Sequence, residues 1–567
     1  MSDSFNTTSQ FLMQASLGAD YSTIERVAQE GIEEWLEQQL NTPWNANESY
    51  LKLTSSIWQE FRAKLLTAHG EEAINGEGNN PALPYWYYFR MAWWHKALES
   101  KSQDLLRQRV AQALSEIIVI SDKSNLQLDA LGMADFYDIL YQNAFGNYGD
   151  ILEQVSLHPM MGVYLSHLNN QKANVAQNIH PDENYAREIM QLFSIGLNQL
   201  NGDGSEKIGA DGNPIPTYSN QDIKELARVF TGLKGAEYLY EWNSAFGYNH
   251  SPLSFDDGVE KIYKTIPFIN MLKPMQGDEN YHDRGAKILL DGAINVPANQ
   301  SVQADIQKVV SDLMNHPNTA PFIAKKMIQQ LVTSNPSPAY IKACARAFGT
   351  QGDMRALIKT ILTHSEASKP EKLKSPMLRT TQILKAFGAS NQSQKLWVIG
   401  DSIEYGLEHH ILSSPTVFNF YLPDYAPHGE IANANQVAPE FQIHNSATSI
   451  GYINLMYQWS FGGTLPMVST QIHSQLNNIT ETEWEVLEKN TKDKLHLNLE
   501  TEIALAQAQK FDELIEHMAL ILTGNAKLDA HDSIKEAFKN YAQSPEWVVQ
   551  TVLFMIVISP EFTVLKG

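Results

Sequence analysis

The chain has 567 residues, of which 43% are hydrophobic and 19% charged, a composition typical of folded globular proteins rather than disordered ones. Its 64 acidic and 42 basic residues give a formal charge of −22, so the surface repels phosphate backbones and general nucleic-acid binding is not expected. A single cysteine, Cys344, excludes an intramolecular disulfide and a cysteine-based metal site.

Helical patterns fill the first part of the chain. Apolar side chains recur at helical spacing over residues 8–40, where Gly18 and Gly31 separate three short helices. The same spacing predicts helices at 48–69, around the aromatic stretch 86–94, and at 103–121, 131–144 and 150–159. These patterns predict an N-terminal helical region over residues 1–235.

The segment 180–193 carries more polar side chains than a surface helix needs. Pro181 and the acids after it suit a helix N-terminus, where free N–H groups and the helix dipole favour negative charge. We therefore expect a central helix at 181–198. Two of its faces are polar, one carrying Asn184, Glu188 and Gln191 and the other Glu183 and Arg187. This mixture indicates a helix that lines a buried polar cleft.

The rest of the chain divides by composition into four regions. Residues 236–300 are rich in Tyr, Phe, Gly and Pro and predict an irregular insertion with a few short strands. Helical patterns return over 301–390, a long loop follows at 391–445, and helices occupy 446–567. A loop of this length is more often the wall of a site than a linker. We expect a mainly α, multi-helical fold in which all regions form one integrated domain.

Membrane and export signals are missing from the sequence. No stretch reaches the roughly 18 consecutive apolar residues of a membrane-spanning helix. The first residues, Met1 to Phe5, have neither a basic region nor an apolar core of a signal peptide. The sequence therefore predicts a soluble protein with no transmembrane segment and no signal peptide in this chain.

Several segments, in order along the chain, resemble the domain-of-unknown-function 1800 (DUF1800) family of bacterial proteins. They are residues 11–18, 144–148, 155–159, the Pro-x-Glu-Asn-Tyr-Ala-Arg-Glu core within 181–193, 222–232, His282-Asp283 with Lys287, and 415–425. The resemblance implies a large, mainly helical protein. It also suggests a periplasmic or secreted location, because family members often carry export signals. It implies no particular activity.

The family core supplies the candidate catalytic residues. Glu183 and Glu188 are carboxylates suited to act as a general base or to bind a hard metal ion, and Asn184 is a polar partner. Arg187 is suited to bind an anionic group of a substrate. The alternative is a buried ion-pair network that holds helices together.

A second set of candidates lies outside the central helix. His282 and Asp283 are adjacent in an irregular stretch, and with His158 or a glutamate they predict a site for zinc, iron or manganese. The alternatives are a loop-capping aspartate, a hydrogen-bonded His282, and a His158 that faces a helix C-terminus. The candidate substrate-binding residues in this set are Arg107, Arg109 and Lys287. The alternative for Arg107 and Arg109 is that they form salt bridges with the many acidic residues.

The pattern of motifs narrows the classes of function. The sequence has no phosphate-binding Gly-rich loop, no H-E-x-x-H and no G-x-S-x-G, which disfavours NTPases, zinc proteases of that class and α/β-hydrolases. We expect a hydrolase-like enzyme that acts on a polar polymeric substrate such as a glycan. Its chemistry would rely on carboxylates as acid and base, or on a divalent metal ion as cofactor. The alternative is a non-catalytic scaffold or binding module whose polar cluster is structural.

Overall fold

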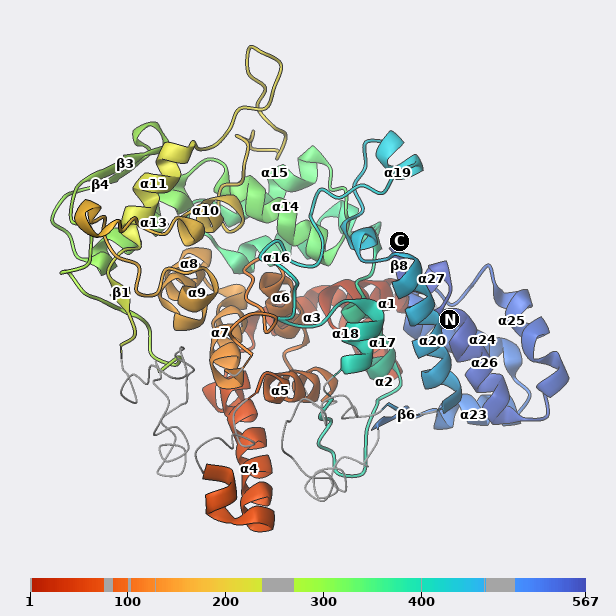
Figure 1. Cartoon of the computed structure of the whole chain (residues 1–567). Helices are drawn as coiled ribbons and strands as arrows, with labels where there is room; N and C mark the ends of the chain where they lie inside the picture. The colour runs from red at the N-terminus through yellow and green to blue at the C-terminus, as the bar shows by residue number, and fades with distance from the viewer. Residues whose placement is uncertain are drawn as a thin grey trace.

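The computed structural model describes residues 3–75, 85–99, 103–127, 129–236, 270–398, 400–462, 464–465 and 495–566. Helices dominate these residues and the strands are two or three residues long, which confirms the predicted mainly α fold (Figure 1). Every helix in the described ranges is too short or too polar to span a lipid bilayer.

The helices of the N-terminal region begin near the positions that the sequence predicts. They are α1 (Asp3–Ala15), α2 (Tyr21–Glu30), α3 (Ile32–Asn41), α4 (Tyr50–Asn75), α5 (Tyr87–Leu98), α6 (Leu105–Ser115), α7 (Ala130–Gln142), α8 (Tyr148–Leu157), α9 (Pro159–Tyr164), α10 (Asn184–Gln191) and α11 (Asn220–Val229). Side-chain caps fix several of these starts: Asp20 accepts from Thr23 N–H, and Ser219 and Asp222 form a reciprocal capping box.

The helices of the C-terminal half are α13 (Val302–Asn315), α14 (Thr319–Leu331), α15 (Pro338–Phe348), α16 (Met354–Thr363), α17 (Pro376–Ala386), α18 (Asp401–Leu407), α19 (Glu430–Asn433), α20 (Ser446–Gly462), α23 (Glu500–Gln507), α24 (Phe511–Thr523), α25 (His531–Phe538), α26 (Pro545–Val557) and α27 (Pro560–Thr563). Several begin with a serine cap followed by proline at the first helical position, as at Ser337-Pro338 and Ser375-Pro376. Proline suits that position because its missing N–H would have had no partner there.

The strands form antiparallel pairs. These are β1 (Leu233–Lys234) with β2 (Gln276–Gly277), β3 (Lys287–Leu289) with β4 (Ile294–Val296), β5 (Glu371–Leu373) with β8 (Val564–Lys566), and β6 (Thr464–Leu465) with β7 (Leu495–His496). In the first two pairs the register places Leu233 opposite Gly277 and Lys287 opposite Val296. The pair β3–β4 lies beside α11 and α13 at one side of the molecule, and β1 lies on the same side (Figure 1). The loop that carries His282 connects β2 to β3.

Most buried hydrophobic side chains form one connected core that extends from Phe11 to Phe562, and Phe420, Tyr421 and Ile443 form a smaller separate cluster. Large aromatic residues are prominent in it, among them Trp35, Trp58, Trp93 and Trp94, none of which exposes more than 1% of its surface. Aromatic side chains bury large areas and dominate core energetics, so this core can hold many short helices without long strands.

Two segments differ from the sequence-based prediction, and a third lies partly outside the described residues. The central helix α10 covers only Asn184–Gln191 instead of 181–198, because the backbone turns after Gln191 and Gly196 takes a positive φ of 71°. The segment 391–445 contains the short helices α18 and α19 as well as loop. Of the predicted insertion 236–300, residues 237–269 lie outside the described residues.

Candidate functional site

Three of the predicted site residues lie at the surface around the start of α10. Glu183 precedes the helix and its Oε2 is 3.3 Å from NH2 of Arg187, with 37% and 39% of the two side chains exposed. Asn184 is exposed, and its backbone N–H donates to Oδ1 of Asp182. An exposed ion pair of this kind contributes only about 0.3–0.5 kcal/mol to stability. These polar groups are therefore free to contact a solute.

Glu188 lies one turn further along α10 in a different environment. Its side chain is 4% exposed, and Oε2 is buried without a hydrogen-bond partner. Desolvation raises the pKa of Glu188, and the positive charge of Arg187 opposes this only in part. A carboxyl group in this environment binds a proton more readily than a solvated one does.

Two phenols lie near enough to Glu188 to feel its charge. Burial and the charge of Glu188 raise the pKa values of Tyr164, at the end of α9, and of Tyr218 to about 12. The hydroxyl of Tyr218 donates to Oε1 of Gln191 at 3.0 Å, and the phenol of Tyr164 is hydrogen-bonded to Ser414. Side chains from α9, from α10 and from the segment before α11 thus come together near Glu188.

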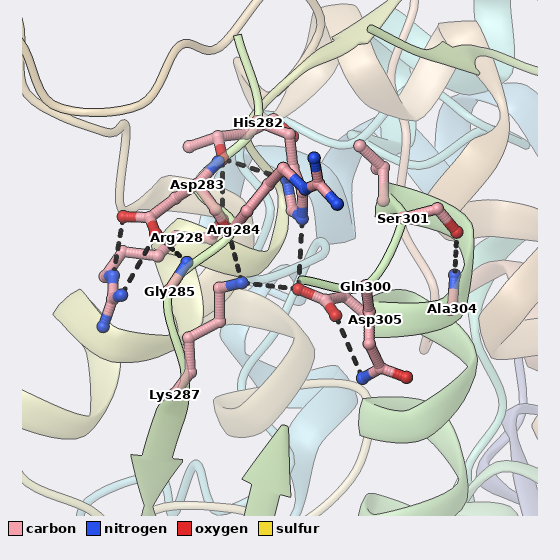
Figure 2. Close-up of polar contacts among 12 residues, drawn as sticks. Arg228, His282, Asp283, Arg284, Gly285, Lys287, Gln300, Ser301, Ala304 and Asp305 are labelled. Carbon is pink, nitrogen blue, oxygen red and sulfur yellow. Dashed lines mark hydrogen bonds and ion pairs between the residues drawn. The ribbon is translucent and has the colours of Figure 1, made fainter. Parts of the chain in front are cut away.

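His282 belongs to a separate, fully buried group (Figure 2). Its Nδ1 lies 2.8 Å from the carbonyl oxygen of Thr231, and its Nε2 lies 3.1 Å from Oδ2 of Asp305 on α13. Both ring nitrogens of His282 are therefore in contact with acceptors from the protein itself.

Lys287 completes this group, and Asp283 faces away from it. The ammonium of Lys287 donates to Oδ2 of Asp305 and to the carbonyl oxygen of Asp283, both at 2.5 Å, and the lysine and Asp305 side chains are each 1% exposed (Figure 2). The carboxylate of Asp283 instead accepts from Nε and NH2 of Arg228 at 2.8 and 3.1 Å. Desolvation acts to raise the pKa of Asp283, but the hydrogen bonds and charge of Arg228 lower it. Lys287 is inaccessible to a substrate in this structure.

Arg107 and Arg109 are buried and bind parts of the protein itself. The guanidinium of Arg107 donates to the carbonyl oxygens of Thr42, Tyr141 and Gln142 at 2.7, 3.1 and 3.0 Å. The last two are at the C-terminal end of α7, where carbonyl groups lack partners within the helix. Arg109 donates to the Gln112 side chain and to the carbonyl oxygen of Gln330. Neither guanidinium forms the direct salt bridge that was the alternative, and neither is open to a substrate.

His158 connects two helices. Its Nδ1 accepts the backbone N–H of Met160 at the start of α9, so Nε2 carries the proton and lies 3.2 Å from Oδ2 of Asp135. His158 is therefore the N-terminal cap of α9, and it also follows the last residue of α8. Its acceptor nitrogen is occupied by a backbone N–H.

The predicted residues fall into two sets that are not joined by polar contacts in the described part of the chain. Within the described ranges no hydrogen bond or ion pair joins His282, Asp283 or Lys287 to Glu183 or Glu188. Those ranges also contain no group of three or more His, Cys, Asp or Glu side chains placed to hold a metal ion. The three predicted metal ligands, His158, His282 and Asp283, each have a protein partner.

A comparison of the whole chain with models of known protein families tests the resemblance to the DUF1800 family. A family model described as "Protein of unknown function (DUF1800)" matches residues 10–564. The chain belongs to the DUF1800 family. No curated protein and no solved structure matches it. The match runs from within α1 to the start of β8, so it includes both the surroundings of Glu188 and the buried His282 group.

Several polar residues of this DUF1800 protein have no clear signal in the sequence. Asp305 appears there only as an acid in the first turn of a helix, yet its carboxylate contacts both His282 and Lys287. Tyr164 and Tyr218 carry no local signal at all. Glu116 interrupts an apolar run from Leu114 to Ile120, and this is a weak sign of a buried polar partner. The partners of these residues could not be read from local patterns.

Glu116 is the carboxylate of a second buried group in the DUF1800 chain. Its Oε2 accepts from the hydroxyl of Tyr421 at 2.7 Å, and Oε1 lies 3.5 Å from Nε2 of His409. Desolvation acts to raise the pKa of Glu116, but His409, Tyr421 and Arg109 outweigh it and lower the pKa to about 2. The adjoining cavity has a volume of only about 10 Å³, enough for one water. This group fixes the segment around residues 409–421 onto α6.

Proposed function

We propose that this protein is an enzyme that performs carboxylate acid/base chemistry on a polar substrate, with Glu188 as the group that accepts and returns a proton. The observation that carries the proposal is that Glu188 is 4% exposed while its Oε2 has no hydrogen-bond partner. A buried carboxylate without partners costs roughly 1–3 kcal/mol or more of stability. Strongly perturbed carboxyl groups of this kind concentrate at functional sites.

Asp305 shows how this chain treats a carboxylate whose role is structural. Its two oxygens accept hydrogen bonds from Lys287 and Gln300 and face the imidazole of His282. By contrast, no side-chain hydrogen bond of Glu188 is formed with any described residue, and its charge is opposed only by the partly exposed Arg187. Glu188 therefore lacks the partners expected of a helix-packing ion pair.

The groups around Glu188 suit a substrate rich in hydroxyl groups. Arg187 and Asn184 offer N–H donors, and Glu183 offers acceptors, all from side chains that are at least partly exposed. Tyr218 and Gln191 add a hydroxyl and an amide beside the carboxylate. Donors and acceptors spaced along one helix can bind successive polar groups of a polymer, and for this reason we favour a glycan substrate and hydrolase-like chemistry. Because desolvation raises the pKa of Glu188, its carboxyl group holds a proton more readily than a solvated carboxyl group does, as a general acid/base requires.

The proposal is tested by Glu188→Gln with Glu183→Gln as the matched control. Purified protein is incubated with a panel of soluble polysaccharides and peptidoglycan fragments, and release of reducing ends is measured. Because general acid/base groups contribute at least about a hundredfold, we expect Glu188→Gln to lose that factor in rate and Glu183→Gln to keep most of it. Thermal melts accompany the assay, and we expect the melting temperature of Glu188→Gln to be unchanged or higher, since the substitution removes a desolvated charge.

Two results would overturn the proposal. One is a Glu188→Gln variant that folds and releases reducing ends as fast as the parent protein. The other is a loss of about 3–5 kcal/mol of stability on Glu188→Gln, the size seen when a buried ion pair is broken. The second result would favour the alternative of a non-catalytic scaffold whose polar residues serve only helix packing.

A further inference from the structure

Helix α20 is apolar on two opposite sides. One side, which includes Tyr452 and Trp459, is buried in the core. The other side carries Ile450, Ile453 and Tyr457, which recur at helical spacing and expose between 45% and 61% of their surface. A helix that is hydrophobic all round is normally covered all round. The exposed side of α20 is therefore a candidate contact surface.

Aromatic rings of α26 and of the segment before it extend this surface. The helices α20 and α26 pack against each other (Figure 1), and Trp547 and Tyr541 are each just over half exposed. The rings are in contact: the centroid of Trp547 lies 6.0 Å from Tyr541 and 5.6 Å from Phe461, and Phe461 lies 4.8 Å from Tyr457. We call five exposed side chains the α20–α26 face: Ile450, Ile453, Tyr457, Tyr541 and Trp547.

The α20–α26 face is large enough for a specific protein interface. Aromatic side chains have roughly 150–250 Å² to bury, and three of them are about half exposed here, so with the two isoleucines the face offers on the order of 500 Å² of apolar surface. Two such faces together would bury about 1,000 Å², the lower limit for a biological interface. Apolar patches of several hundred Å² on a soluble protein are often functional.

Charged residues are almost absent from the two helices of this face. The 17 residues of α20 include no Asp, Glu, Lys or Arg, and the 13 residues of α26 include only Glu546, whereas 19% of the whole chain is charged. Because each chain carries a formal charge of −22, two copies repel each other over most of their surface, and they can approach most easily through a face without acids. The lack of Lys and Arg disfavours a lipid surface, since helices that lie on membranes use these cations.

We propose that the α20–α26 face is the two-fold interface of a homodimer. In a two-fold interface the same patch lies on both copies, so the apolar side chains of this face cover one another and no second complementary surface is needed. Tyr457 and Trp547 are the anchors, as tyrosine and tryptophan commonly are at protein interfaces. Their ring contacts within each copy already hold them in place, so little side-chain freedom is lost on association.

The test is sedimentation velocity of the full chain over a range of concentrations. We expect the mass to rise from 63.8 kDa towards twice that value, with a Kd in the micromolar range because the interface is small. Tyr457→Glu brings two additional negative charges into the interface and should weaken association at least about a hundredfold, whereas Tyr457→Phe keeps the ring and should leave association nearly unchanged. Tyr281→Glu is the matched control, because Tyr281 is 50% exposed and lies in the loop after β2, outside the face.

Fluorescence gives a second measurement of the same contact. Association should shift the tryptophan emission to shorter wavelength, because Trp547 leaves water, and Trp547→Phe should associate without this shift. Circular dichroism of each variant confirms that it folds, as expected for substitutions at exposed positions.

Four results would each overturn the proposal. They are a chain that stays monomeric at about 100 µM, a dimer whose Kd is unchanged by Tyr457→Glu, and a Kd that Tyr281→Glu raises as much as Tyr457→Glu does. The fourth is binding of a monomer to phosphatidylcholine vesicles that Tyr457→Glu abolishes, which would assign the α20–α26 face to a membrane surface instead.

Discussion

Oδ2 of Asp305 lies 3.1 Å from Nε2 of His282, and the two side chains expose 1% and 0% of their surface. The ammonium of Lys287 shares the same carboxylate oxygen, so one buried acidic group contacts both side chains. These contacts join α13 to the irregular loop after β2 and hold this loop in place.

Asp305→Asn should therefore destabilise the protein severely. The substitution leaves Lys287 buried without its carboxylate, and breaking a buried pair costs about 3–5 kcal/mol. The measurement is the free energy of unfolding from urea denaturation. Asp312→Asn on the same helix is the matched control, because its pair with Lys308 is partly exposed and should cost less than about 1 kcal/mol. Equal effects of the two variants would contradict the role given to Asp305.

Gly232→Ala should displace the His282 loop. Gly232 has a φ of 82°, and a Cβ atom there would lie 2.8 Å from both the carbonyl oxygen of Asp278 and the backbone nitrogen of His282. Gly212 has the same φ of 82° but open space around it, so Gly212→Ala isolates the backbone strain, about 1 kcal/mol. We expect Gly232→Ala to lose clearly more free energy of unfolding than Gly212→Ala. Similar losses would mean that the loop adapts to the added methyl group.

His167 should make the protein less stable at mildly acidic pH. It is buried against Tyr185, with ring centroids 4.0 Å apart, and desolvation lowers its pKa from 6.5 to about 4. Between these values the unfolded chain binds a proton that the folded chain does not, so the free energy of unfolding falls as the pH drops from 6.5 towards 4. The contribution is at most about 3 kcal/mol. Urea denaturation at pH 7.5 and 5 should show a smaller difference for His167→Gln than for the parent chain.

Glu116 should contribute to acid denaturation in a lower range of pH. Its pKa is lowered from 4.5 to about 2 in the folded protein, so its stabilising effect is complete above 4.5 and is lost as the pH falls towards 2. Tyr421→Phe removes one hydrogen bond to the carboxylate and should raise the pKa of Glu116, which shifts this loss to higher pH. Acid titration followed by tryptophan fluorescence measures the shift. No difference between Tyr421→Phe and the parent chain would argue against the contact.

The helices, their caps and the family were predictable because their causes are local. Apolar residues at helical spacing, Ser219 with Asp222 in a capping box, and prolines such as Pro338 and Pro376 act over one or two turns of backbone. The burial of Glu188 was not predictable in this way, because Asn184 lies on the same helical face and is exposed. Residues 237–269, which lie in the predicted irregular insertion, are outside the described residues.

The sequence by itself therefore determined a mainly α chain, its DUF1800 motifs and the polar character of α10. The tertiary structure alone decided which charges meet: His282 with Asp305, Glu116 with His409 and Tyr421, and Arg107 with three carbonyl groups. The physical reason is that helix formation depends on neighbours within one or two turns. Burial and pairing depend instead on side chains that are distant in the sequence and are brought together by the fold. Only the packing of the core determines which charged side chains are removed from water.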